Sequence, residues 1–120
     1  MRAYLNYDIQ VSKPGINDLR LVPADFLDQL RALVPKPGTD YAKFVSVVVK
    51  PGKAIRDHKH EGNWTALYYV DPADTPITIE GEPYLPEKGE VVVLKPGQVH
   101  GVLENESDCL RVSIAMLVEE

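Results

Sequence analysis

The chain of 120 residues contains three histidines, and each of them follows a Pro-Gly turn. His58 and His60 lie two positions apart in the segment DHKHEGN, shortly after Pro51-Gly52. His100 follows Pro96-Gly97 in the segment KPGQVHG. Histidine is the commonest metal ligand among protein side chains and suits several transition metals. The pattern therefore predicts a metal site formed by His58, His60 and His100, provided that the fold brings them together.

The spacing of the first two histidines suits chelation from one strand. Alternate residues of a strand face the same side, so the imidazoles of His58 and His60 would leave one face if the segment is extended. His100 comes about forty residues later and could join the pair only in a closed sheet or two facing sheets. The alternative is a solvated loop without chemistry, because a spacing of two is common by chance.

Short strands separated by turns dominate the sequence from residue 41 onward. The β-branched and aromatic runs that predict strands are residues 42–49, 64–70, 77–79, 90–94, 99–103 and 110–118. The segment GEPYLPEKG, residues 81–89, predicts a turn. Many short strands with Pro and Gly turns favour an antiparallel sandwich or barrel.

The N-terminal third predicts one strand and one helix. Residues 4–11 alternate between apolar and polar, as in a half-buried strand, and residues 23–34 carry an apolar stripe of helical period. PKPG at residues 35–38 ends this helix, which should pack on the outside of the sheet. The length fits a single domain over residues 1–120, with the strand and helix in 1–40 and the barrel in 41–120.

The amino-acid composition limits the kinds of binding partner that are expected. Eighteen acidic against thirteen basic residues give a net charge of −5, which argues against a nucleic-acid surface. No apolar run is long enough for a membrane span, and no signal peptide is evident. The single cysteine, Cys109, is expected to be a buried small side chain in a reducing compartment. We expect a cytoplasmic protein with a small-molecule or protein substrate, whose strand edges could pair in a homodimer.

Two stretches resemble the conserved motifs of cupins. Gly89 to His100, GEVVVLKPGQVH, is similar to the second cupin motif, and Gly52 to His60 resembles the first. This resemblance implies an all-β, double-stranded β-helix, a jelly-roll barrel preceded here by one helix. Cupins usually place a glutamate four or five residues after the second histidine, where this chain has Trp64 and Thr65. The implied ligand set is therefore three histidines without a carboxylate.

The end of the chain resembles a second group with the same barrel, the non-haem Fe(II), 2-oxoglutarate-dependent oxygenases. In that group an Arg-x-Ser pair follows the last histidine, as Arg111 and Ser113 follow His100 here, and holds the far carboxylate of 2-oxoglutarate. Strand parity places both residues on one face. His60 occupies the position of that group's acidic ligand. Arg111 could instead be an exposed residue paired with Asp108 or Glu106.

These resemblances imply a metal-dependent oxidoreductase, a dioxygenase of Fe(II)/2-oxoglutarate type. Three-histidine iron sites occur in thiol dioxygenases, which resemble cupins. Fe(II) is the first candidate metal, with Zn, Mn and Ni as the other candidates. One alternative is a small cupin that binds a metal for isomerisation, dioxygenation or ligand sensing without 2-oxoglutarate. Another is a structural jelly-roll module without enzymatic activity.

Overall fold

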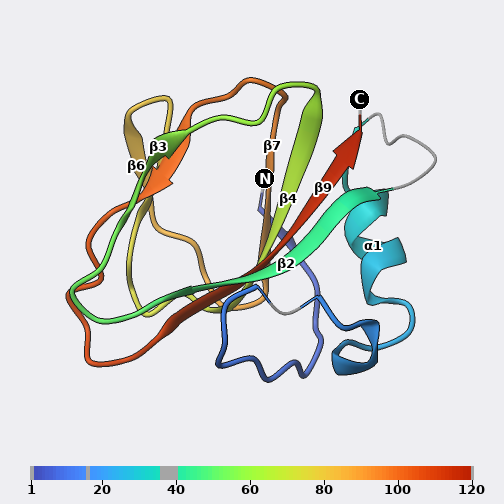
Figure 1. The fold of residues 1–120 in the computed structure, drawn as a ribbon, viewed down its shortest axis with the longest axis horizontal. Coiled ribbons are helices and arrows are strands. Elements are labelled where there is room, and N and C mark those ends of the chain that lie inside the picture. The colour runs from blue at the N-terminus through green and yellow to red at the C-terminus, as the bar shows by residue number, and fades with distance from the viewer. Residues whose placement is uncertain (1, 16, 36–40, 120) are drawn as a thin grey trace.

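The computed structural model of the chain describes residues 2–15, 17–35 and 41–119 (Figure 1). Within these ranges the elements are a 3₁₀ helix over Leu19–Leu21, the helix α1 over Phe26–Ala32, and the strands β1 (Ala3–Tyr4), β2 (Tyr41–Val49), β3 (Ile55–His58), β4 (Asn63–Asp71), β5 (Ile77–Ile79), β6 (Glu82–Tyr84), β7 (Glu90–Leu94), β8 (His100–Val102) and β9 (Arg111–Glu119). Neither helix is long and apolar enough to cross a bilayer.

The strands form two antiparallel sheets. The larger sheet has the order β1-β7-β4-β9-β2, and the smaller has the order β3-β8-β5-β6. Figure 1 shows the smaller sheet on one side of the larger sheet and α1 on the other side. The expectation of an all-β jelly-roll with one helix is confirmed by this arrangement.

The two faces of the larger sheet have different roles because side chains alternate along each strand. On β9, Ile114, Met116 and Val118 belong to the hydrophobic core next to α1. The intervening residues Arg111, Ser113, Ala115 and Leu117 line a cavity on the opposite face. The parity predicted for Arg111 and Ser113 is therefore confirmed.

The predicted helix is present but shorter than expected. Phe26 and Leu30 are completely buried, and the Phe26 ring lies edge-on to Tyr7 and Tyr68, with 5.2 Å between ring centroids in each case. Pro23 begins a turn whose carbonyl accepts from the Phe26 N–H at 3.0 Å, so the α-helix starts three residues later. Packing outside the sheet is confirmed.

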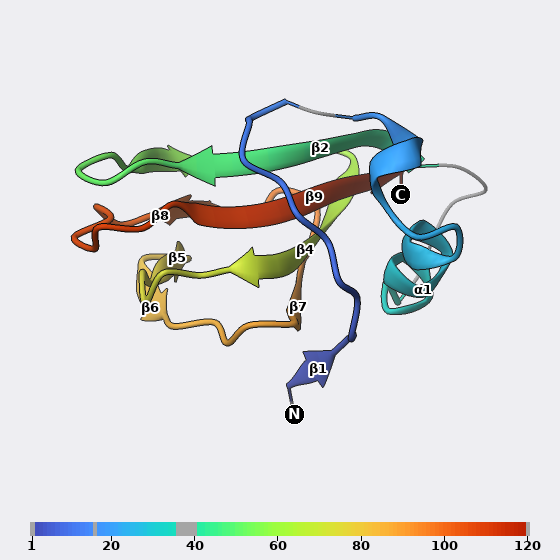
Figure 2. The same cartoon turned by 90° about the horizontal axis from the view of Figure 1, so that it is seen from below.

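The strand predicted over residues 4–11 was wrong for most of its length. Only Ala3 and Tyr4 pair with β7, opposite Val91 and Glu90. Figure 2 shows the reason: the following segment crosses the strands of the larger sheet and does not run beside one. Its backbone therefore has no ladder partner, although burial still alternates along residues 5–11 as the sequence pattern predicted.

Two further expectations need correction. The segment 81–89 is more than a turn, because Glu82–Tyr84 pairs with β5 as the edge strand β6. Glu80 and Gly81 have φ values of 51° and 81°, as a two-residue hairpin turn requires, and Pro83 is tolerated because β6 is an edge strand. Cys109 is exposed and not buried, because it lies in the loop before β9.

Candidate metal centre

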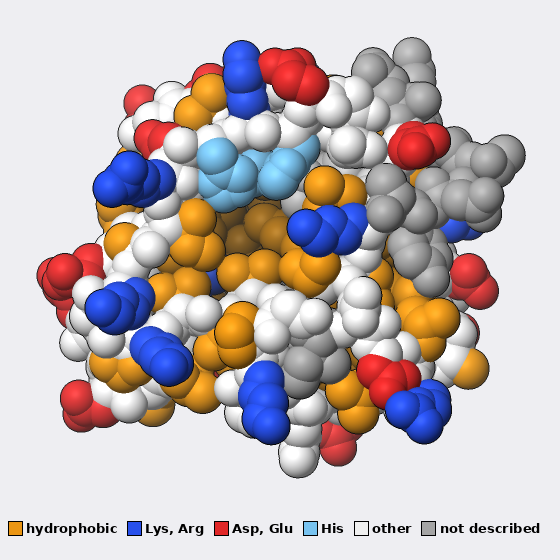
Figure 3. All heavy atoms as spheres, viewed as in Figure 1, with side chains coloured by type: hydrophobic (Ala, Val, Ile, Leu, Met, Phe, Trp, Pro, Cys, Tyr) orange, Lys and Arg blue, Asp and Glu red, His pale blue; other side chains and the backbone are white. Residues whose placement is uncertain are grey.

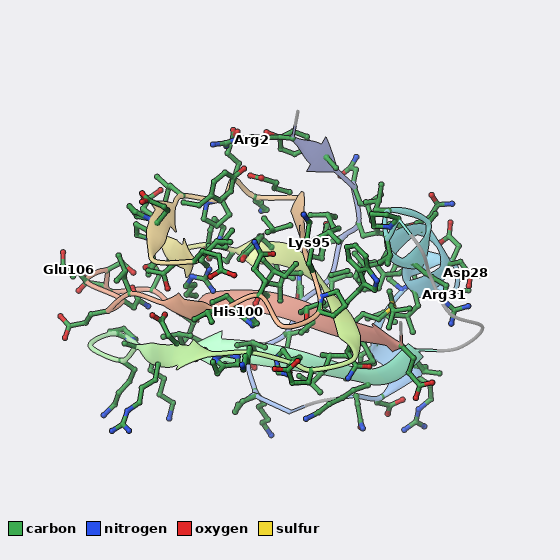
Figure 4. All side chains as sticks on the ribbon, turned by 90° about the horizontal axis from the view of Figure 1, so that it is seen from above. Arg2, Asp28, Arg31, Lys95, His100 and Glu106 are labelled. Atoms are coloured by element: carbon green, nitrogen blue, oxygen red, sulfur yellow. The ribbon has the colours of Figure 1, made fainter. Side chains whose placement is uncertain are left out.

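Two of the three histidines lie on neighbouring strands of the smaller sheet, and the third follows one of these strands in the chain. His58 is the last residue of β3 and pairs with His100, the first residue of β8. The condition that His58 and His60 lie on one strand is not met, because β3 ends at His58. His60 is held beside the turn at Pro96-Gly97 instead, where its carbonyl accepts from the Gly97 N–H at 3.0 Å. Figure 4 shows His100 near the centre of the molecule.

The fold nevertheless brings the three imidazoles together. One ring nitrogen from each of His58, His60 and His100 lies within 4.8 Å of the others. The ring centroids are 4.4 Å apart for His58 and His100, 5.1 Å for His58 and His60, and 5.2 Å for His60 and His100. Nitrogens this close together could be ligands of one ion, for which metal–nitrogen distances are about 2.1 Å.

Among the described residues this cluster contains no carboxylate. Glu61, the acid next to His60 in sequence, forms an exposed ion pair with Lys59 at 3.0 Å. The ligand set that the structure offers is thus three neutral imidazoles, which suit iron, zinc, copper and nickel.

Backbone carbonyls fix the orientation of two of the rings. The Nδ1 atom of His58 lies 2.8 Å from the Arg56 carbonyl, and that of His100 lies 2.9 Å from the Gln98 carbonyl. A carbonyl only accepts, so each Nδ1 must carry the proton, and each Nε2 keeps a free lone pair. This is the usual outer-shell arrangement of metal-ligating histidines.

Burial also favours the neutral form that a metal ligand requires. It lowers the pKa of His60, and positive charge on His100 or His58 would lower that pKa further. Burial likewise lowers the pKa of His100, against the opposing effect of its hydrogen bond to the Gln98 carbonyl.

Gly101 allows the two histidine-bearing strands to lie close together. A Cβ atom at this position would lie 2.5 Å from Oδ1 of Asp57 and 2.9 Å from the Ile55 carbonyl oxygen. We expect Gly101→Ala to push β3 away from β8, to destabilise the fold by about 1–3 kcal/mol, and to weaken metal binding, since His58 and His100 lie on these strands. Urea unfolding and metal titration measure the two effects.

The double variant D57A/G101A serves as the control for this prediction. It removes the carboxylate contact but keeps the contact with the Ile55 carbonyl, so only part of the loss should be recovered. Wild-type stability and metal affinity in the single variant would contradict the prediction.

The histidines border a cavity of about 280 Å³ between the two sheets. Figure 3 shows histidine side chains at the rim of a hollow whose interior is largely hydrophobic. The cavity is lined by Lys43, Val45, Val47, Ile55, His58, His60, Thr65, Leu67, Tyr69, Ile77, Leu94, His100, Gly101, Val102, Arg111, Ser113, Ala115 and Leu117. The structure therefore places all five predicted site residues on one cavity.

Arg111 lies inside the protein. It is 1% exposed, and no ion pair between described residues includes it, so the alternative of an exposed arginine paired with Asp108 or Glu106 was wrong. Figure 4 shows Glu106 at the outer end of the molecule. Nε of Arg111 donates to the Thr75 carbonyl at 3.4 Å, and the guanidinium carbon lies 5.0 Å from the centre of the Tyr69 ring.

A buried asparagine holds the loop that positions Arg111. Asn105 accepts from the Thr75 hydroxyl at 3.3 Å and donates to the carbonyls of Val49 and Cys109 at 3.0 and 2.8 Å. These bonds connect the loop that carries Thr75 with the end of β2 and the start of β9. The fold therefore fixes the position of the Thr75 carbonyl, which accepts from Nε of Arg111.

Tyr69 is a cavity residue that sequence reasoning did not single out. Parity along β4 places Thr65, Leu67 and Tyr69 on the cavity face and Tyr68 on the helix face. The period-two pattern was the available signal, but it could not tell which face of β4 was the inner one.

Neither a family model nor a curated protein matches the sequence. Solved structures do match. A predicted oxalate decarboxylase from Thermotoga maritima is 17% identical, with a TM-score of 0.60 over 82% of this chain and 76% of that chain. A Klebsiella pneumoniae protein with a double-stranded β-helix domain is 21% identical, with a TM-score of 0.55 over 78% and 86%.

A third match is the salicylate 1,2-dioxygenase of Pseudaminobacter salicylatoxidans, 17% identical, with a TM-score of 0.56 over 62% of this chain and 21% of that chain. Structures described as cupins are also among the matches. Similarity at these identities shows the fold, and it confirms the predicted double-stranded β-helix of cupin type.

Proposed function

We propose that this protein is a metal-dependent oxygenase that binds one divalent ion through His58, His60 and His100, with Fe(II) as the first candidate. The observation that carries the proposal is the orientation of the rings. The Nδ1 atoms of His58 and His100 face backbone carbonyls, so their Nε2 lone pairs are free within a cluster of three imidazoles. Oxygenase chemistry is supported by the fold shared with a salicylate 1,2-dioxygenase.

The residues of the site suit such an ion. Three histidines leave coordination positions open, through which a bound metal would supply Lewis acidity and reactivity toward oxygen. The chain's own contribution is to hold the neutral ligand tautomers and to keep bulk water out with an apolar cavity wall. A cavity of about 280 Å³ supports a small-molecule substrate in preference to a protein one.

A more specific version of this proposal is that the protein uses 2-oxoglutarate as a cosubstrate. It rests on the sequence resemblance together with the position of Arg111. Arg111 and Ser113 line the same cavity as the histidines and would hold the far carboxylate of the cosubstrate. The second candidate is a metal-dependent cupin without 2-oxoglutarate. The buried Arg111, which has no carboxylate partner among the described residues, is the observation that favours the 2-oxoglutarate form.

Metal analysis of protein purified without added metal tests the proposal. We expect about one equivalent of a transition metal, or stoichiometric uptake of Fe(II) in an anaerobic titration. If the protein uses 2-oxoglutarate, its addition to the Fe(II) protein would produce a visible charge-transfer band that Arg111→Ala weakens, whereas absence of the band would favour the second candidate. A protein that takes up none of Fe(II), Zn(II), Mn(II) and Ni(II) would instead support the structural module.

A further inference from the structure

The guanidinium of Arg111 is a buried positive charge without a counterion among the described residues. Arginine stays protonated in proteins, so it cannot relieve its burial by losing a proton. Its Nη2 atom is inaccessible to solvent and makes no hydrogen bond with any described residue. A buried charge left unpaired in this way is strongly unfavourable, and it is retained at the wall of a cavity that could admit an anion.

The hydroxyl of Tyr69 is a second donor without a partner at the same place. It too is buried and donates to no described acceptor, and the only described side chain that hydrogen-bonds its oxygen is the guanidinium of Arg111. Burial raises the pKa of Tyr69, and the adjacent positive charge of Arg111 opposes that rise. At neutral pH the phenol is therefore protonated, and it can donate to the same acceptor as Nη2.

The buried carboxylate of Glu90 already has hydrogen-bond partners within the protein. The charge of Glu90 also acts on Tyr69, but its oxygens accept from the Tyr84 hydroxyl and from the Glu87 N–H at 2.9 Å. Arg2 lies 3.4 Å from Glu90 as well. Glu90 is not among the residues that line the cavity, so it does not neutralise the end of the cavity at Arg111.

The wall between Arg111 and the histidines is apolar. Both sheets contribute aliphatic side chains to it, namely Val45, Val47, Ile55, Leu67, Ile77, Leu94, Val102, Ala115 and Leu117. Lys43, whose charge acts on His60, marks the histidine end of the cavity. Lys43 pairs with Leu117, and five residues of β9 lie between Leu117 and Arg111. The anion-binding end and the metal-binding end are thus separated by a hydrophobic section.

We propose that the cavity binds an organic acid with one carboxylate and an apolar body, whose carboxylate accepts hydrogen bonds from Nη2 of Arg111 and from the Tyr69 hydroxyl. As a statement about the substrate this rests on the proposed metal-dependent function in its form without 2-oxoglutarate, because that cosubstrate would occupy Arg111 itself. A carboxylate matches the site because one unit of negative charge meets one guanidinium, and its two oxygens can accept from both donors.

Ligand binding to the full-length, metal-free protein tests this inference without any activity assay. Calorimetric titration should show benzoate binding at least about tenfold more tightly than benzamide, which has the same shape without the charge. Tyr69→Phe should weaken benzoate binding about tenfold, and Arg111→Met by about a hundredfold, as expected for hydrogen bonds to a charged group. Tyr68→Phe is the matched control: it removes the same hydroxyl from the helix face of β4 and should leave binding unchanged.

Several results would overturn the inference. Equal affinity for benzoate and benzamide, or full benzoate affinity in Arg111→Met, would show that Arg111 does not form a carboxylate-binding site. Tighter binding of 2-oxoglutarate or inorganic phosphate than of benzoate would show that the site does not select an apolar body.

Metal titration of the same samples separates this inference from the proposed function. Metal uptake without benzoate binding would overturn the inference alone. Benzoate binding without metal uptake would support the inference and contradict the oxygenase.

Discussion

Replacing His100 with alanine is expected to abolish stable binding of a divalent metal and to leave the fold intact. His100 is the most buried of the three histidines, at 8% exposure, and its ring is fixed by the Gln98 carbonyl. Loss of an outer-shell partner alone typically lowers metal affinity 10- to 100-fold. Loss of a ligand should therefore lower the affinity by more than about a hundredfold, measured by anaerobic Fe(II) titration, with any oxygenase activity lost in parallel.

Lys59→Ala is the matched control for this experiment. Lys59 lies between His58 and His60 in sequence, but its side chain is exposed and paired with Glu61. Its removal should leave metal affinity and the circular dichroism spectrum at wild-type values. Wild-type metal affinity in His100→Ala would contradict a site that needs all three histidines, and equal losses in both variants would indicate that the loop conformation is responsible.

The sequence predicted the site better than the segments that hold it. Parity along residues 110–118 correctly placed Arg111 and Ser113 together, because a strand with one face in the core leaves no choice of register. The same reasoning was wrong for residues 4–11, where alternating burial arises from a chain that crosses the sheet. Period-two patterns report which side chains are buried, and they do not report whether the backbone has a neighbour to pair with.

The meeting of the histidines depends on long-range features that local patterns do not contain. His60 lies outside β3 and is held through its carbonyl by Gly97, from the turn before β8. Likewise, the burial of Arg111 depends on the loop that carries Thr75, which an asparagine far along the chain fixes in place. A local pattern can identify the residue types, but only the closed sheet pairing brings them to one cavity.

Replacing Arg111 with methionine is expected to stabilise the ligand-free protein. Methionine keeps much of the apolar stem and removes a buried charge without a counterion, whose desolvation costs several kcal/mol. The losses are the 3.4 Å contact with the Thr75 carbonyl and the stacking of the guanidinium on Tyr69, which together contribute about 1–2 kcal/mol. We expect a net gain of about 1–3 kcal/mol in the free energy of unfolding, measured by urea denaturation.

Arg111→Lys distinguishes charge from volume in this prediction. Lysine is shorter and can relieve its burial only by losing a proton, which costs free energy at neutral pH, so it should bring a smaller gain in stability than methionine does. A loss of stability in Arg111→Met as large as that in Arg111→Lys would mean that Arg111 is a structural residue whose contacts outweigh its burial.

Binding of an anion should offset the stability that Arg111 costs the ligand-free protein. An anion that binds only the folded state raises the stability of the wild type by an amount set by its concentration and dissociation constant. Benzoate should therefore raise the melting temperature of the wild type and leave that of Arg111→Met unchanged, which narrows or reverses the difference between them. A residue that costs stability in the empty protein and returns it when an anion binds is maintained for its ligand, as expected where function and stability conflict.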